Sequence, residues 1–109
     1  MIIQPENQSR ELGKPVVFTC LVSGYPVPTV EWRKDKSSIS STKDGRIKQS
    51  LLNTNATVIQ SVLNITAVTR NDNGTYFCES SNVVENLKET TELLVLGMIF
   101  SVVFYLYLG

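Results

Sequence analysis

Hydrophobic and polar residues alternate with a period of two through most of the chain between its ends. In residues 15–23 the even positions are apolar and fall on one face: Val16, Phe18, Cys20 and Val22. The same alternation recurs in residues 28–35, 61–68 and 74–80, and turn-forming residues separate these runs. A period of two is typical of strands that bury one face, and no stretch carries a long amphipathic helical pattern. The pattern therefore predicts an all-β fold, an antiparallel sandwich of two sheets.

Three residue types are spaced in a recognisable way along these strands. Cys20 is followed by Trp32, and Cys78 closes the sequence DNGTYFC, in which Tyr76 stands two positions before the cysteine. This spacing resembles the signature of an immunoglobulin domain of the intermediate type, or I-set. Residues 11–35 resemble the early strands of that family, and residues 90–96 resemble its final strand. The resemblance covers roughly residues 3–97.

The resemblance implies a particular architecture. The fold would be a Greek-key sandwich with strands A, B, E and D in one sheet and strands A′, G, F and C in the other. Cys20 and Cys78, both on inward faces, would form one inter-sheet disulfide, and Trp32 would pack against it in the core. In related domains the tyrosine turns its hydroxyl back onto the corner backbone, which is the role expected of Tyr76.

The resemblance also implies an ion pair at the base of the sandwich. In similar domains an Asp four positions before the tyrosine pairs with an Arg that opens strand D, so we expect Arg46 to pair with Asp72. If the pair is partly buried, losing either partner should cost more than the roughly 1 kcal/mol of a surface pair. Gly74 would give the tight turn between strands E and F its conformational freedom.

Composition removes several classes of function. Ten basic and ten acidic residues give a net charge of zero, so the electrostatic basis for binding nucleic acid is missing. The chain has no histidine, and two cysteines alone cannot build a structural zinc site. With both cysteines assigned to a disulfide, no nucleophile has a base beside it. We therefore expect neither an enzyme, nor a metal site, nor a cofactor.

Four Asn-X-Ser/Thr sequons occur in the chain, and together with a disulfide they indicate an oxidising, extracellular compartment. We expect each asparagine to be exposed, and Asn64 is the best candidate because it lies between the inward positions Leu63 and Ile65. Asn73 is the least favoured, because it sits in the tight corner between strands E and F. A chance origin is the alternative, since the chain is rich in Asn, Ser and Thr. The four candidate glycosylation sites are Asn7, Asn55, Asn64 and Asn73.

A glycan on Asn64 would shield one sheet and leave the opposite sheet for a partner. On that sheet the strand alternation turns Phe77 outward, and Leu94 faces out if its neighbours Leu93 and Val95 face in. An apolar pair rimmed by charge is a candidate partner face. The residues of this predicted face are Phe77, Leu94, Glu31, Arg33 and Glu79.

The end of the chain is apolar and differs from the rest. We expect a domain over residues 1–97 and a separate apolar tail over residues 98–109, which carries no charge. The tail is shorter than the roughly 20 residues of a membrane helix. It is interpreted as the start of a membrane span, as an unrelated terminal fragment, or as extra β structure, and the first interpretation is favoured.

The leading functional hypothesis is an extracellular binding module of a cell-surface adhesion molecule or receptor, whose partner is a protein ligand or a like immunoglobulin domain. The alternative is a structural domain of an intracellular muscle filament protein of the titin kind, against which the sequons and the cysteine pair argue. Basic residues in the region from strand C to strand D could bind a heparin-like glycan, but we favour solvated charge because Asp35 and Asp44 are interspersed. These basic residues are Lys34, Lys36, Lys43, Arg46 and Lys48.

Overall fold

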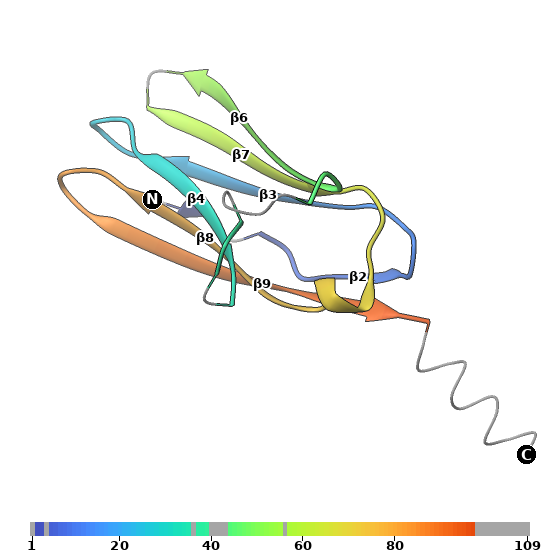
Figure 1. The fold of residues 1–109 in the computed structure, drawn as a ribbon. Coiled ribbons are helices and arrows are strands. Elements are labelled where there is room, and N and C mark those ends of the chain that lie inside the picture. The colour runs from blue at the N-terminus through green and yellow to red at the C-terminus, as the bar shows by residue number, and fades with distance from the viewer. Residues whose placement is uncertain (1, 4, 36, 40–43, 56, 98–109) are drawn as a thin grey trace, which may run out of the picture.

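A computed structural model describes residues 2–3, 5–35, 37–39, 44–55 and 57–97 of the chain. Across these residues the secondary structure consists mainly of strands in two facing sheets, with the short 3-10 helix η2 before β8 (Figure 1). The elements are β1 (Ile2–Ile3), β2 (Gln8–Glu11), β3 (Val16–Ser23), β4 (Thr29–Lys34), β5 (Ser37–Ser38), β6 (Ile47–Asn55), β7 (Val58–Ile65), η2 (Arg70–Asp72), β8 (Gly74–Ser81) and β9 (Asn86–Leu96).

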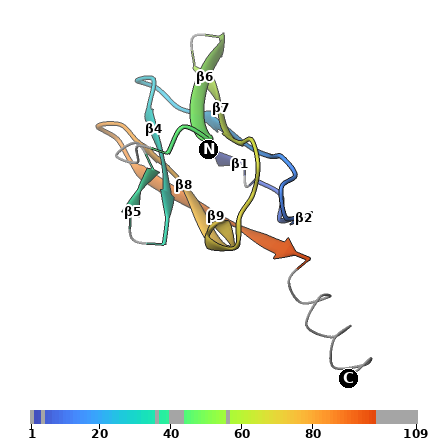
Figure 2. The same ribbon diagram turned by 45° about the vertical axis from the view of Figure 1, so that its right-hand side comes forward.

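The two sheets have the strand orders expected of an immunoglobulin sandwich. One sheet runs β1-β3-β7-β6 and corresponds to strands A, B, E and D, with every pair antiparallel. The other runs β2-β9-β8-β4-β5 and corresponds to A′, G, F and C with one added edge strand. In this second sheet β2 pairs with β9 in parallel. Seen from the side, the two sheets form separate layers (Figure 2). The predicted fold class is confirmed.

The alternation read from the sequence explains how the layers join. Along β3 and β8 the even positions are buried and the odd ones are more exposed, while along β7 the odd positions are the buried ones. Their inward side chains meet between the sheets in one core, because burying one face of each sheet removes apolar surface from water. The fully or nearly buried members of this core are Val16, Phe18, Cys20, Val22, Trp32, Ile39, Leu63, Ile65, Val68, Tyr76, Cys78 and Leu93.

A disulfide crosses the centre of the core. Cys20 and Cys78 are bonded, with their Cα atoms 6.5 Å apart and 58 positions between them in the sequence. Trp32 is the direct cross-strand partner of Cys78 and is completely buried. Its indole Nε1 donates a hydrogen bond of 2.8 Å to the Ser61 hydroxyl in the opposite sheet, so its polar atom is satisfied in the interior.

Some elements differ from the sequence expectation. The last strand begins at Asn86, earlier than residue 90, and β5 adds a short strand at the edge of its sheet. Every side chain from residue 48 to residue 52 is exposed, so β6 projects beyond the core and shows no clean alternation. Within the part of the chain that the structure describes, no helix has the length and apolar character needed to cross a membrane. The expected apolar tail, residues 98–109, lies outside the described residues.

Candidate functional site

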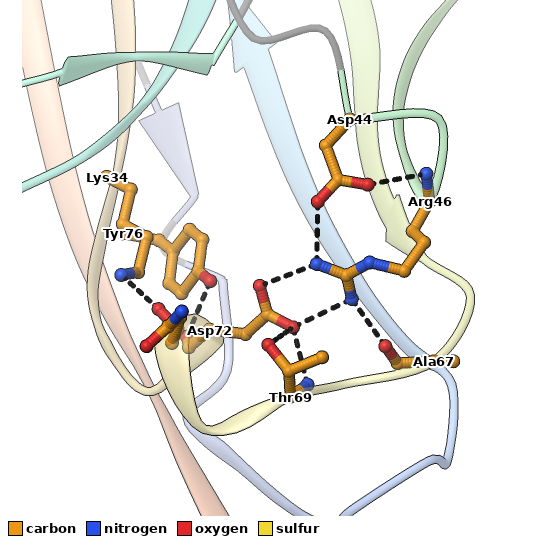
Figure 3. Close-up of polar contacts among 8 residues, drawn as sticks. Lys34, Asp44, Arg46, Ala67, Thr69, Asp72 and Tyr76 are labelled. Atoms are coloured by element: carbon orange, nitrogen blue, oxygen red, sulfur yellow. Dashed lines mark hydrogen bonds and ion pairs between the residues drawn. The ribbon is translucent and has the colours of Figure 1, made fainter.

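The corner between β7 and β8 gathers the acidic, basic and hydroxyl groups that the sequence singled out (Figure 3). Arg46, which precedes β6, places Nη1 2.9 Å from Oδ2 of Asp72 and Nη2 2.7 Å from Oδ2 of Asp44. Its Nη1 also donates to the carbonyl of Ala67. The structure thus brings together the predicted pair Arg46 and Asp72, and it adds Asp44 as a second carboxylate on the same guanidinium.

Asp72 is the most enclosed charged group of this corner network, which we define as Arg46, Asp44, Thr69, Asp72 and Tyr76. Its side chain is only 6% exposed, whereas that of Arg46 is 30% exposed. Its Oδ2 accepts hydrogen bonds from the backbone N–H of Thr69 at 2.7 Å and from the Thr69 hydroxyl at 3.2 Å. Burial raises the pKa of the carboxyl, but the bonds from Arg46 and Thr69 outweigh it and leave the pKa of Asp72 below its ordinary value.

Tyr76 closes the corner from within the core. Its hydroxyl donates a hydrogen bond of 2.6 Å to the backbone carbonyl of Asp72, and its ring is fully buried beside Phe18, with the two ring centroids 5.5 Å apart. Burial, and then the charge of Asp72, raise the pKa of the phenol well above its usual range. Gly74 has a φ of +145°, which side-chain-bearing residues rarely adopt. These groups are therefore engaged in closing the fold.

The outer face of the five-stranded sheet holds four of the five predicted partner-face residues close together. Arg33 Nε lies 3.3 Å from Glu79 Oε1, and Arg33 Nη2 lies 3.6 Å from Glu31 Oε2. We call these three residues the charged cluster. Phe77 is the cross-strand partner of Arg33, and the ammonium of Lys88 stands 5.2 Å from the centre of the Phe77 ring. Phe77 is thus half-buried under a cation.

Leu94 was expected beside Phe77, and the register of β8 and β9 shows that this expectation is wrong. Phe77 pairs with Thr90, four positions before Leu94 on β9. At about 3.3 Å per residue the two side chains are separated by about 13 Å along the strand. The sequence assigned each residue to the correct face, but it did not set the pairing of the two strands, because the start of β9 was placed too late.

Four exposed apolar side chains lie at one end of the sandwich, on the loop between β3 and β4 and on the loop between β8 and β9. Tyr25 is 79% exposed and Val27 47% exposed between β3 and β4, while Val83 is 91% and Val84 71% exposed between β8 and β9. We call these four residues the apolar tip. Large apolar residues within turn segments were the signal that could have identified it.

A single side chain joins the two loops of the apolar tip. Asn82 Nδ2 donates to the carbonyl of Pro26 at 2.8 Å, across the gap between the loops. Its Oδ1 accepts from the backbone N–H groups of Val84 and Glu85, both at 2.9 Å. The loop of residues 82–85 is thereby tied both to itself and to its neighbour, so the exposed valines stand on a fixed backbone.

The sequons lie on different surfaces. Asn64 is exposed in β7, on the outer face of the four-stranded sheet, between its cross-strand partners Val17 and Lys48. Asn7 and Asn73 are also exposed and lie on either side of β9. Asn55 ends β6, and its side chain is outside the described residues. Glycosylation stays a prediction at all four positions.

The predicted heparin-like cluster is only partly described, because Lys36 and Lys43 lie outside the described residues. Arg46 is held by two carboxylates, and Lys34 donates to the carbonyl of Asn71 at 2.6 Å. Among the described residues, no three His, Cys, Asp or Glu side chains are arranged to hold a metal ion.

Comparison with known proteins places this geometry in a family. Residues 1–82 match the family model described as "Immunoglobulin domain". Human neogenin is 33% identical over 92 residues, which are 84% of this chain and 6% of neogenin. The Drosophila melanogaster cell adhesion molecule Dscam1 is 32% identical over 91 residues, which are 84% of this chain and 4% of Dscam1. The chain therefore spans a small fraction of the curated relatives it matches.

Solved structures agree with the family model. The titin domains Z1Z2, crystallised in complex with telethonin, superpose with a TM-score of 0.77 at 29% identity over 88% of this chain and 47% of that one. The sandwich, the central disulfide and the corner network thus define an immunoglobulin-type module. The chain belongs to the immunoglobulin domain family.

Proposed function

We propose that this chain is an extracellular protein-recognition module of a cell-adhesion molecule or receptor, and that it binds through the apolar tip. The observation that carries the proposal is the exposure of Tyr25, Val27, Val83 and Val84 on two loops joined by Asn82. Exposed apolar side chains grouped in this way are typical of protein-binding surfaces. Because the loop backbone is already held in place, binding would cost little conformational entropy.

Two further observations support the extracellular location. A disulfide in the core fits an oxidising compartment, since cytosolic thiols are normally kept reduced. One relative, Dscam1, is named as a cell adhesion molecule. The partner that we propose to test first is a second copy of this chain. Its apolar tip would pack the same four side chains against those of the first copy. An interface between two tips would be isologous, with the same patch on both copies.

The charged cluster and Phe77 form the second surface that we propose for partner contact. Arg33 is already paired with Glu31 and Glu79, and Phe77 lies under Lys88. A partner at this face would have to replace internal ion pairs, which gains little net free energy. We therefore assign binding energy to the apolar tip and orientation to the charged cluster.

Sedimentation equilibrium of the secreted chain tests self-recognition through the tip. The variant Val83→Ser with Val84→Ser should weaken self-association at least about tenfold, because two exposed apolar anchors are lost. Val17→Ser is the matched control, since Val17 is 44% exposed on the opposite sheet, and it should leave association unchanged. A wild-type chain that stays monomeric, or equal association by the wild type and the tip variant, would contradict the proposal.

A structural domain in an intracellular filament is the second candidate function. It is favoured by one observation, the similarity of the fold to the titin Z1Z2 domains at 29% identity. The two candidates differ in the expected state of Cys20 and Cys78, which should be disulfide-bonded outside the cell and reduced inside it.

A further inference from the structure

Two sequons that are far apart in the sequence meet on either side of β9. In the pairing of the five-stranded sheet, Leu93 of β9 is opposite Gln8 of β2 on one side and Gly74 of β8 on the other. Gln8 and Gly74 are the middle residues of the sequons 7–9 and 73–75. Both sequons line one shallow depression of about 480 Å³, together with Glu92, Leu93 and Leu94.

The carboxamides of Asn7 and Asn73 are oriented by the backbone of β9. Oδ1 of Asn73 accepts a hydrogen bond of 2.8 Å from the N–H of Val95, and Oδ1 of Asn7 accepts one of 3.0 Å from the N–H of Glu92. A backbone N–H can only donate, so the atom facing β9 must be the oxygen in both cases. The amide nitrogen Nδ2 is then the atom that each exposed asparagine presents away from β9.

Nδ2 is also the atom to which an N-linked sugar is attached. Glycosylation of Asn73 would form a bond between Nδ2 and the anomeric carbon of N-acetylglucosamine. The bond from that carbon to a lipid-linked diphosphate would break, the lipid diphosphate would leave, and Nδ2 would lose one proton. The oxygen is untouched, so the hydrogen bond from Val95 survives the modification. The corner that holds Asn73 can therefore carry a glycan without refolding.

Leu94 gives the sugar an apolar surface at this position. Its side chain is 50% exposed, and its partner on β2 is Ser9. On the other side of β9 the ladder ends at the pair Gly74–Leu93, so Asn73, which directly precedes β8, lies next to Leu94. Asn7 lies instead beside Glu92, which is charged and exposed. Covering Leu94 removes apolar surface from water, whereas covering Glu92 does not. Asn73 is thus the better placed of the two asparagines.

We propose that Asn73 is an N-glycosylation site whose first sugar lies against Leu94 in the depression beside β9. The proposal rests on the extracellular location proposed above. It takes Leu94 out of the partner face, because the sugar and not a protein partner covers this leucine. If Asn64 on the opposite sheet is also glycosylated, two surfaces remain open to a protein partner. They are the charged cluster on the five-stranded sheet and the end of the sandwich that carries the apolar tip.

Site occupancy in the full chain, secreted behind a leader from mammalian cells, tests the modification. Peptide mass spectrometry should find most Asn73 glycosylated in the wild type and in Thr75→Ser, which keeps the sequon, and none in Thr75→Ala. The Thr75 variants keep Asn73 and its bond to Val95. Asn73 unmodified while Asn64 is glycosylated would overturn the proposal and leave the extracellular location standing. Reduced cysteines in the chain isolated from its native cells would instead contradict the location.

A second measurement tests the contact with Leu94. Enzymatic trimming to the first sugar gives a domain that differs from Thr75→Ala by one sugar at Asn73 and by the Thr75 side chain, because any glycan at the other sequons is common to both. The side-chain difference is the same with leucine and with serine at position 94, so the comparison of the two backgrounds isolates the contact with Leu94. We expect that sugar to raise the Tm by about 2–4 °C. In a Leu94→Ser background most of this increase should disappear. An equal increase with leucine and with serine at position 94 would show that the sugar does not rest there.

Discussion

Asp72 illustrates how a single buried charge can be tolerated in a small sandwich. An isolated carboxylate in the interior would be strongly destabilising, but this one receives bonds from Arg46, from the Thr69 N–H and from the Thr69 hydroxyl. The backbone carbonyl of the same residue accepts the Tyr76 hydroxyl. Asp72 therefore links the strand that follows Arg46 to the corner before β8.

Replacing Asp72 by asparagine should lower the free energy of unfolding by about 2–3 kcal/mol. The change removes the charge that faces Arg46 and leaves the guanidinium with Asp44 alone. We expect less than the full penalty of a deeply buried pair, because the Arg46 side chain is 30% exposed. Urea denaturation measures the loss.

Asp44→Asn is the matched control for this prediction. Asp44 contacts the same guanidinium, but its side chain is more exposed than that of Asp72. Its replacement should cost clearly less than Asp72→Asn. Equal losses for the two variants, or no loss for Asp72→Asn, would contradict the role given to Asp72.

The lowered pKa of Asp72 predicts how stability depends on acidity. Because the folded pKa lies below the ordinary value of about 4, the carboxylate contributes its full stabilisation well above pH 4. As the pH falls, the unfolded chain takes up this proton first, so the contribution declines from about pH 5 until folded Asp72 is also protonated. Urea midpoints measured between pH 7 and pH 2.5 should fall more steeply for the wild type than for Asp72→Asn. Parallel curves would refute this assignment.

At the level of elements, Asn82 determines the geometry of the apolar tip. Its carboxamide fixes the loop between β8 and β9 and reaches the carbonyl of Pro26 in the loop between β3 and β4. The loop between β8 and β9 joins two strands of the five-stranded sheet, whereas the loop between β3 and β4 crosses from one sheet to the other. The backbone ladder between β4 and β8 ends at Thr29 and Ser81, and beyond it this one side chain connects the two loops.

Asn82→Ala should release both loops while leaving the sandwich intact. We expect stability to fall by about 1–2 kcal/mol, since three hydrogen bonds near the surface are lost. Amide exchange of Val84 and Glu85 should accelerate at least about tenfold, whereas the amides of β3 and β7 should change only as much as global stability does. Unchanged exchange at Val84 would mean that Asn82 does not hold the tip.

Elements also show how far the sequence could predict the structure. Strands with one buried face, such as β3 and β8, were readable because their apolar residues follow a period of two. β6 is exposed on both faces from residue 48 to residue 52, and β5 contains only two serines. Neither strand therefore has the alternation of apolar and polar residues from which a strand can be predicted. Pairing between strands depends on both partners, which is why the separation of Phe77 from Leu94 was missed.

The sequence could predict those site residues that the fold itself requires, but it could not predict the apolar tip. Arg46, Asp72 and Tyr76 follow from the resemblance, because the corner recurs in similar domains. The apolar tip depends on which loops meet in space, and the bond between Asn82 and Pro26 joins residues 56 positions apart. No local sequence pattern in either loop predicts that contact.

At the scale of the whole molecule, the disulfide links the stability of the folded domain to the redox compartment in which the bond can form. Closing a loop of 58 positions is worth about 4 kcal/mol in the chain-entropy model, a large part of the stability of a domain of this size. A chain that folds with this bond is suited to an oxidising environment. On the proposals made above, the apolar tip would serve for binding, and the glycan beside Leu94 would shield another part of the surface.

The redox state of the cysteines in the native protein tests the central claim most directly. Cells that make the chain would be lysed in an alkylating agent without reductant, and peptides containing Cys20 and Cys78 would be identified by mass spectrometry. An extracellular recognition module predicts one linked peptide pair, with no alkylated cysteine at either position. Recovery of both cysteines in the alkylated form would contradict the extracellular assignment and favour the intracellular filament domain.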